Sequence, residues 1–542
     1  MSYFLNQIKK RKELTTLIIT FSTFIIIGVL LHKDYGISVD EWDLRRLGFV
    51  YLKYIFEIFN INNLLELDKI MNIPKVSDYG GNTHGVIFVL PMAFIEYFFN
   101  ITDIQKNYFL RHIINHFIFL ISNFYFFLLV KERFNNWLYG FFASIFLFLS
   151  PRIYAESFYN HKDILFMSFF IISLYYGIKF LKNPSIRNSL LFSLSTALST
   201  DIRIMGIILV PIIFFFIFLN KHNYVKKYLT RGTIIYFITL PIFIYIFWPY
   251  LWTDPINHFV EIFKNLSSYN WEGYNLYFGE YILGSNLPWH YVLVWIGITT
   301  PLLYIFLFFV GFTNTTLILK NRIFLVNEKI NEGNIWKGDD ELHDLIYYLL
   351  FLIPIILVIS LNSTLYDGWR HLYFIYPLFL IFTIKGLYFF YISFFKKKHF
   401  IFYSTLFVFI LHIIFVMITT HPYQNVYFNF FAGKNIVYNF DVDYWGLSNK
   451  QSFEYILKND KRNEIKLGSA GPISLKNSMD ILTYNDANRF DIVDNSEADY
   501  IINNYRNWFG YVKEEYKIPD NFSIFKEIII HGNKIVTIYK RI

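Results

Sequence analysis

The stretch LTTLIITFSTFIIIGVLL, residues 14–31, decides the fold class because it is a nearly unbroken apolar run. A helix needs about 20 such residues to cross roughly 30 Å of hydrocarbon. Similar runs recur at 233–248 and 401–419, and the 542 residues are 55% hydrophobic and only 17% charged. This composition is too apolar for a soluble enzyme of that length. We therefore predict a polytopic, mainly α-helical membrane bundle.

Four basic residues at 9–12 precede the first run, while 28–36 contains no small-x-small cleavage site. This pattern predicts an uncleaved anchor with a cytoplasmic N-terminus. Cysteine is absent, so disulfides and thiolate metal sites are excluded. The net charge of +8 comes mostly from short loops between apolar runs, which argues against a nucleic-acid partner.

The basic loops predict the topology. The positive-inside rule makes each of them cytoplasmic, and they are 131–133, 179–187, 221–231, 320–337 and 396–398. The connections between pairs of apolar runs then face outward. Three apolar runs precede Lys131, but parity allows only two crossings, and the short run 86–99 contains Pro91 and Glu96. We expect this run to lie as a helix in the outer interface, which leaves about eleven spans and an outer loop of roughly 80 residues.

A second domain is predicted at 421–542, after the membrane domain at 1–420. Short alternating stretches with polar turns are typical of a small α/β domain, here on the extracytoplasmic side. Ser448 and Gln451 predict a capping box that opens a helix. Strands are expected at 465–467 and 500–502, and a hairpin at 525–539 turning at His531-Gly532-Asn533.

Asp40 and Glu41 follow the first span directly. A carboxylate pair in a loop is often only a solvated acidic turn. The alternative is a general base at the membrane surface, beside a second carboxylate that raises its pKa or binds a cation. A divalent metal ion is therefore a possible cofactor, and no other cofactor is expected.

The outer loop at 150–163 packs Glu156, His161, Lys162 and Asp163 between two spans. Asp163 could simply cap the next helix. Placing so many ionisable groups beside lipid is costly unless they face a wet cavity. We take Glu156, Lys162 and Asp163 as candidate site residues.

Two further outer turns carry basic residues. Arg370 and His371 precede a span that contains Pro377, and Arg370 could either snorkel or bind a phosphate. Asp201 and Arg203 lie at another outer turn and could pair with each other. The sequence contains no P-loop, no dinucleotide fingerprint after a strand, no G-x-S-x-G and no H-E-x-x-H motif.

With these residues placed, the chain resembles the GT-C membrane glycosyltransferases. Within them it is most similar to the branch that contains the protein O-mannosyltransferases and the lipid A aminoarabinose transferase, that is, to proteins like those of glycosyltransferase family 39. The resemblance covers about 420 residues in order and spacing. Its matched positions are Asp40-Glu41, the span led by Arg111, the loop from Ser150-Pro151 to Asp163, and Arg370. The family's Lys-Pro-Pro-Leu-like stretch is replaced by His84-Gly85-Val86, so its usual lysine is missing.

The resemblance implies a sugar transfer from a polyprenyl-phosphate donor to a hydroxyl of a lipid, glycan or protein acceptor, at the outer face of a cell membrane such as the bacterial inner membrane. Asp40 would be the base, at a site where Asp40, Asp163 and Arg370 converge. Arg370 would neutralise the departing phosphate, with His371, His84 and Arg203 as further candidates and Lys162 beside them. Asp163 or Glu156 would orient a substrate, and Glu41 would tune Asp40 or hold a divalent ion.

Three other functions stay open at this stage. A transporter or lipid flippase predicts charges near the bilayer midplane and related halves of the chain, whereas the charges here lie at outer span ends. A polysaccharide polymerase or ligase shares the lipid-linked donor but carries its key residues in one large late outer loop. A catalytically silent scaffold would use only its exported C-terminal domain.

Overall fold

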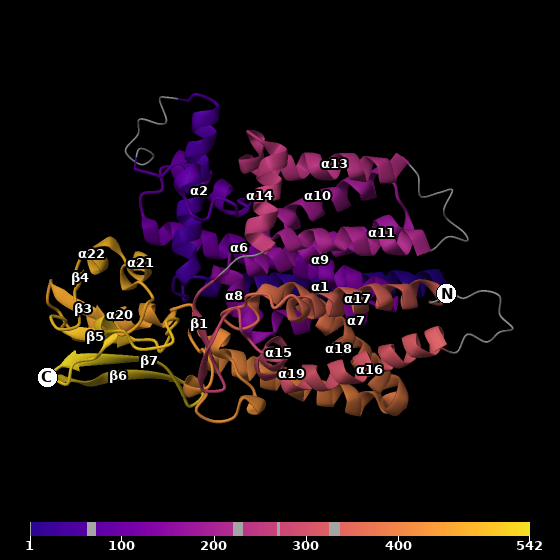
Figure 1. The fold of residues 1–542 in the computed structure, drawn as a ribbon. Coiled ribbons are helices and arrows are strands. Elements are labelled where there is room, and N and C mark those ends of the chain that lie inside the picture. Colours follow the sequence, from indigo (N-terminus) through magenta and orange to yellow (C-terminus); the bar gives the residue numbers. More distant parts are fainter. Residues whose placement is uncertain (1, 62–71, 220–230, 268–270, 325–335) are drawn as a thin grey trace.

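The computed structural model describes residues 2–61, 72–219, 231–267, 271–324 and 336–542. Long helices lie side by side with their axes roughly aligned, and a small domain with a β-sheet lies at one end of this bundle (Figure 1). The fold is therefore a polytopic helical bundle with a C-terminal α/β region, as the sequence predicts, and this is consistent with the architecture that the GT-C resemblance implies.

All eleven apolar runs expected to cross the membrane form helices. Within the described ranges, seven are long and apolar enough to span a bilayer, and the bent pair α7 (Trp137–Phe148) and α8 (Pro151–Tyr159) would be an eighth. The seven are α1 (Ser2–Leu31), α6 (Ile104–Phe134), α9 (Asp163–Lys182), α16 (Leu302–Phe324), α17 (Gly338–Ser360), α18 (Tyr376–Phe390) with its flanking turns, and α19 (His399–Thr420).

The three remaining runs form shorter helices. They are α10 (Ile186–Ile202), α11 (Leu209–Leu219) with its preceding turn η2 (Ile204–Ile208), and α13 (Arg231–Phe247). Each falls short of the length needed to cross an average bilayer upright. The sequence predicts about eleven spans, whereas the described residues hold seven helices, or eight with the bent pair, that are long and apolar enough to cross a membrane. The three shorter helices lie parallel to them (Figure 1).

The basic loops gather at the end of the bundle that carries the N-terminus. Lys10, Lys131, Lys179 and Lys182 line one cavity there, of about 990 Å³, together with Asp339 and other groups. The opposite end carries the C-terminal domain (Figure 1). The basic residues at 221–230 and 325–335 lie outside the described residues.

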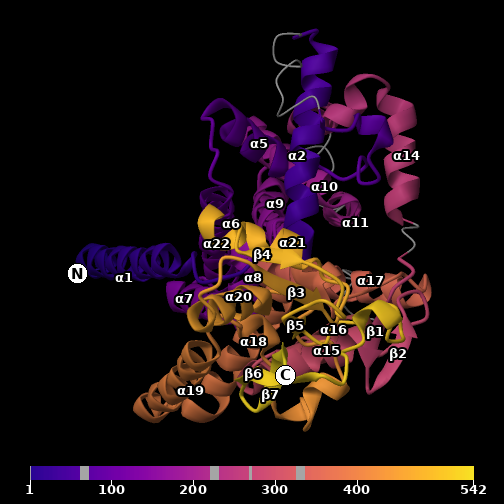
Figure 2. The same cartoon turned by 90° about the vertical axis from the view of Figure 1, so that its left-hand side faces the viewer.

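Two helices outside the predicted spans lie across the axis of the bundle instead of along it. In Figure 1, α2 (Val39–Ile58) and α14 (Pro255–Ser267) run across the end of the bundle. The run 86–99 forms only the ten-residue helix α5 (Val89–Phe98), about half the length of a span. It packs beside α2 at this end, as Figure 2 shows.

The C-terminal region contains a five-stranded sheet in the order β4-β3-β5-β7-β6. Its strands are β3 (Ile465–Ser469), β4 (Phe490–Ile492), β5 (Tyr500–Asn503), β6 (Phe522–Ile530) and β7 (Asn533–Arg541). The first three are parallel, whereas β7 pairs antiparallel with β5 and β6. His531 and Gly532, at φ of 48° and 83°, form the predicted hairpin turn. A smaller hairpin, β1 (Tyr274–Tyr277) with β2 (Glu280–Leu283), lies between α14 and α15 (Tyr291–Thr299).

The predicted capping box at Ser448 is wrong. Helix α20 (Ser448–Asn459) begins at Ser448, so this residue is inside the helix and not at its cap. The Asp443 carboxylate, from outside the helix, accepts hydrogen bonds from the backbone N–H groups of Leu447 and Ser448 at 3.2 and 2.9 Å. A side chain five residues upstream therefore satisfies the free donors of the first turn.

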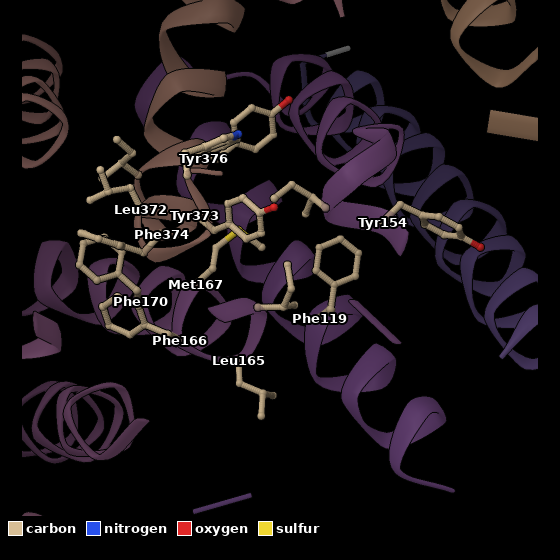
Figure 3. Packing of buried hydrophobic residues seen from close by; sticks show 14 of the residues in the cluster. Phe119, Tyr154, Leu165, Phe166, Met167, Phe170, Leu372, Tyr373, Phe374 and Tyr376 are labelled. Atoms are coloured by element: carbon tan, nitrogen blue, oxygen red, sulfur yellow. The ribbon is translucent and has the colours of Figure 1, made fainter. Parts of the chain in front are cut away.

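Buried aromatic side chains hold together the helices that carry the candidate site. Phe374, in the turn η4 (Arg370–Ile375), lies with its ring centroid 4.8 Å from that of Phe166 and 5.0 Å from that of Phe170 on α9. Figure 3 shows this cluster, with Tyr373 and Met167 beside it. Because such rings bury large apolar areas, the packing fixes the first turn of α9 against η4.

Candidate active site

Asp40 and Glu41 stand on the first turn of α2 but point in different directions. The Asp40 side chain is 33% exposed, whereas Glu41 is 1% exposed. A Glu41 oxygen accepts a hydrogen bond from the Ser38 N–H at 2.7 Å, and the other lies 3.0 Å from Nε2 of His112 on α6. Adjacent helical positions are about 100° apart, so only Asp40 faces the accessible side.

Arg370 is the centre of the site. Its Nη1 lies 2.6 Å from an Asp40 oxygen and 3.6 Å from an Asp163 oxygen, while its Nη2 lies 3.3 Å from Asp367. The guanidinium is stacked between the rings of Tyr366 and Trp445, with centroids at 4.7 and 4.6 Å. The structure therefore brings Asp40, Asp163 and Arg370 into direct contact from three distant parts of the chain.

Asp163 opens α9, and its carboxylate is held from two sides. It pairs with Arg203, from the end of α10, and with Arg370. The Asn160 side chain donates to one Asp163 oxygen at 3.1 Å and accepts the Asp163 N–H at 2.8 Å. Asp163 is thus not the cap of its own helix, a role that the Asn160 amide performs in part.

Arg203 does not pair with Asp201, as the sequence had allowed. Asp201 is buried and accepts a hydrogen bond from the Ile87 N–H at 2.9 Å. Gly85 passes so close that a Cβ there would lie 1.6 Å from the Asp201 carbonyl oxygen, so only glycine fits. Because Gly85 packs against Asp201, the neighbouring His84 lies near Lys162 and Arg203.

Glu156 is buried behind the accessible groups. One oxygen accepts hydrogen bonds from the hydroxyls of Tyr373 and Tyr444, at 2.7 and 3.1 Å, and the other accepts from Asn160 at 2.8 Å. The side chain is 0% exposed. Glu156 therefore holds Asn160, which in turn holds Asp163.

Basic groups face one another on the accessible side, namely His84, Lys162, Arg203 and His371, all of them half-buried. Burial and the nearby Arg203 lower the pKa of Lys162 to about 7. The positive charge of Lys162 and burial lower the pKa of His84 to about 3. Among the described residues, Lys162 forms no ion pair within 4 Å. Lys162 and Arg203 are the cations of this group, and two cations held close together favour the binding of an anion.

The site offers little for a metal ion. In the part of the chain that the structure describes, no three His, Asp or Glu side chains are placed to hold one together. Glu41 faces His112 and the Ser38 N–H and turns away from Asp40, so the two carboxylates do not form a shared ligand pair. The metal dependence stays a prediction.

Several partners in this site are absent from the sequence-based candidates, among them His112, Tyr373 and Tyr444. His112 follows Arg111 inside an apolar run, and a polar residue in such a run is a signal that could have found it. Tyr373 and Tyr444 carry no such signal, because tyrosine is abundant throughout this chain.

Comparison with known families supports the class of protein that this arrangement suggests. Residues 89–252, from α5 to the turn η3 (Pro249–Trp252), match the family model of the dolichyl-phosphate-mannose-protein mannosyltransferases. The matched segment contains Glu156, Lys162, Asp163 and Arg203. Arg370 contacts Asp163 from outside the segment and pairs in turn with Asp40. A search of curated proteins found no match.

The fold and this match indicate a multi-pass membrane glycosyltransferase. More particularly, the chain is similar to the mannosyltransferases of the GT-C type.

Proposed function

We propose that this protein transfers a sugar from a polyprenyl-phosphate donor to an acceptor hydroxyl at the extracytoplasmic face of the cell membrane, with inversion at the anomeric carbon. The observation that carries the proposal is the convergence of three cationic side chains, Arg370, Lys162 and Arg203, next to the accessible Asp40 carboxylate. The pairing of an anion site with a base is what this reaction requires.

The donor phosphate would bind among Arg370, Lys162, Arg203, His84 and His371. A phosphate there raises the lowered pKa values of Lys162 and His84, because it adds a negative charge that offsets the repulsion from the neighbouring cations. The same groups then neutralise the charge that builds on the phosphate as it leaves. No general acid is needed, since a phosphate is a good leaving group.

Asp40 would act as the general base. In the present arrangement it pairs with Arg370 at 2.6 Å. A bound phosphate competes for that guanidinium and thereby frees the Asp40 oxygen to accept a proton. The acceptor O–H gives its proton to Asp40, its oxygen bonds to the anomeric carbon, and the bond to the phosphate oxygen breaks with its electron pair on phosphate. Attack opposite the leaving group inverts the carbon.

The other carboxylates would position these groups. Asp163, 1% exposed, holds Arg203 and Arg370, and Glu156 holds Asn160 and Tyr373. Glu41 anchors the start of α2 to α6 through His112. In this proposal they act on the substrate through Arg370, Arg203 and Asp40.

The charge distribution supports the proposed orientation. Basic residues around Lys10, Lys131 and Lys179 gather at the end that carries the N-terminus, which the positive-inside rule assigns to the cytoplasm. The candidate site and the C-terminal domain lie at the other end (Figure 1). A polyprenyl tail in the bilayer would present its sugar phosphate at this level. Partners of the protein would thus be the lipid-linked donor, an outer acceptor and membrane lipids.

The transfer can be tested with purified protein added to native membranes from a strain that lacks it, with release of free polyprenyl phosphate as the readout. Asp40→Asn should lower the rate by about 10²- to 10⁴-fold, the usual effect of losing a general base. Asp43→Asn, which removes an exposed carboxylate from the same helix turn, should leave the rate unchanged. Full activity of Asp40→Asn would exclude Asp40 as the base.

A further inference from the structure

Arg506 is an arginine of the C-terminal domain that reaches the candidate active site. It follows β5 in the chain, and its side chain is 1% exposed. One guanidinium nitrogen lies 2.7 Å from an oxygen of Asp367, and the other lies 2.7 Å from an oxygen of Asp441. Both arms of the fork are therefore occupied by buried carboxylates.

Asp367 connects Arg506 to the reacting groups. Its second oxygen lies 3.3 Å from Nη2 of Arg370, whose Nη1 lies 2.6 Å from Asp40. An unbroken series of charge pairs thus runs from Asp441 through Arg506, Asp367 and Arg370 to Asp40. Arg370 is the only member of this series that the proposed function assigns to the phosphate.

The backbone turn at Asp367 has a conformation that contacts from neighbouring residues must stabilise. Asp367 and Gly368 have φ of 56° and 73°, and a non-glycine residue with such a φ is strained. The Asp367 N–H donates to the Asn275 side chain at 3.1 Å, and the Gly368 N–H donates to the Tyr291 hydroxyl at 3.2 Å. Arg506 adds the charged contact to the Asp367 side chain.

Arg506 itself cannot contact a substrate in this arrangement. It is buried between Trp271 and Trp508, with ring centroids 5.9 Å from its guanidinium carbon. Its effect must pass through Asp367. We propose that Arg506 is a positioning residue that holds Asp367 and thereby orients Arg370, so that the C-terminal domain completes the active site.

The charges of the buried groups support this role. Burial raises the pKa of Asp367, and Arg506 and then Arg370 oppose that shift, while Asp40 and Asp163 add to it. The Tyr291 hydroxyl also faces this carboxylate. Without Arg506 the carboxyl would take up a proton more readily and would hold Arg370 less firmly.

The proposal rests on the proposed function, and the release of polyprenyl phosphate in the membrane assay tests it. Arg506→Met should lower turnover about tenfold, as expected when a group that orients a reacting residue is lost. The control is Arg462→Met, since Arg462 of the same domain also pairs with two aspartates, Asp460 and Asp499, and neither of these pairs with Arg370. The control should keep wild-type turnover.

A double-mutant cycle separates positioning from general stability. If Arg506 acts through Asp367, then Arg506→Met, Asp367→Asn and the double variant should all lose about the same tenfold, because the two residues form one unit. Independent structural damage would instead multiply to about a hundredfold in the double variant, and this would overturn the proposal. Should Arg506→Met fail to fold, Arg506→Lys keeps one charge and replaces it in the cycle.

The pH profile gives a second readout. The ionised Asp367 holds Arg370, so turnover is present above its pKa and is lost as the pH falls through it. Arg506→Met raises that pKa, and the acid limb should therefore move to higher pH. In the Asp367→Asn background the same substitution should not move it. Equal profiles for wild type and Arg506→Met would overturn the proposal, whereas an inactive wild-type protein would contradict the proposed function itself.

Discussion

The two ends of the bundle differ in how their charged side chains are paired. At the end that carries the N-terminus, Lys179 and Lys182 lie 2.8 and 3.1 Å from Glu132, and Lys182 also lies 3.3 Å from Asp339. At the other end Lys162 faces Arg203 and has no carboxylate within 4 Å among the described residues. Charges that neutralise each other stabilise a structure, whereas a cation with no paired carboxylate can bind an added anion.

Buried charge shows the same contrast. Asp344, near the N-terminal end, is shared between Arg133 and Lys385. Asp40 is also paired with an arginine, but its side chain is 33% exposed while that of Asp344 is 5% exposed. The Asp344 carboxylate is thus closed to ligands and the Asp40 carboxylate is open to them, and we name the two ends the closed and the open end after these carboxylates.

The largest expected effect comes from the centre of the open end. Arg370→Met should lower turnover in the membrane assay by about 10²- to 10³-fold, because a preorganised donor to the leaving group is lost. Turnover should be measured per folded protein, counted by size-exclusion chromatography. A rate close to that of the wild type would remove Arg370 from the chemistry.

The closed end should respond in stability instead. Asp344→Asn leaves Arg133 and Lys385 buried without their shared carboxylate, which should cost about 3–5 kcal/mol. Thermal unfolding in detergent measures the loss. The turnover of the folded fraction should stay at the wild-type value, and a matching loss of turnover would show that the two ends are coupled.

A pH effect should appear only at the open end. Lys162, with a pKa of about 7, is partly deprotonated near neutral pH, and a bound phosphate raises that pKa. The affinity for farnesyl phosphate, a short prenyl phosphate, should therefore fall by up to about tenfold as the pH rises above 7.5. Lys162→Met should flatten this dependence. Lys179→Met, at the closed end, should leave it as in the wild type.

The smallest effect is expected at the partly exposed pairs of the closed end. Glu132→Gln removes the carboxylate shared by Lys179 and Lys182, whose side chains are 36% and 31% exposed. Solvent screens such pairs, so the loss of stability should be no more than about 1 kcal/mol. Calorimetric or fluorescence melting beside Asp344→Asn would check the ranking.

The sequence could predict the features that depend on local pattern. Each apolar run became a helix, the strands at 465–467 and 500–502 formed, and the hairpin turned at His531-Gly532. The placement of Asp40, Asp163 and Arg370 at one end followed from where helices begin and end. These features need only periodicity, turn chemistry and the thickness of a bilayer.

The sequence could not predict which polar partners meet. Asp201 and Arg203 are two residues apart, yet the helix end turns Asp201 toward Ile87 and Arg203 toward Asp163. Glu41 adjoins Asp40 but is buried against His112. Asp443, not Ser448, caps α20. In each case the contact depends on the tertiary arrangement of distant elements, which spacing along the chain does not contain.

Analysis of membrane lipids in a strain that lacks this protein tests the central claim most directly. A polyprenyl-phosphate sugar should accumulate, and its level should return to normal with the wild-type protein or Asp43→Asn but not with Asp40→Asn. The mass of the accumulated lipid would also identify the sugar. Unchanged lipid-linked sugars in the deletion strain, or full restoration by Asp40→Asn, would contradict the account.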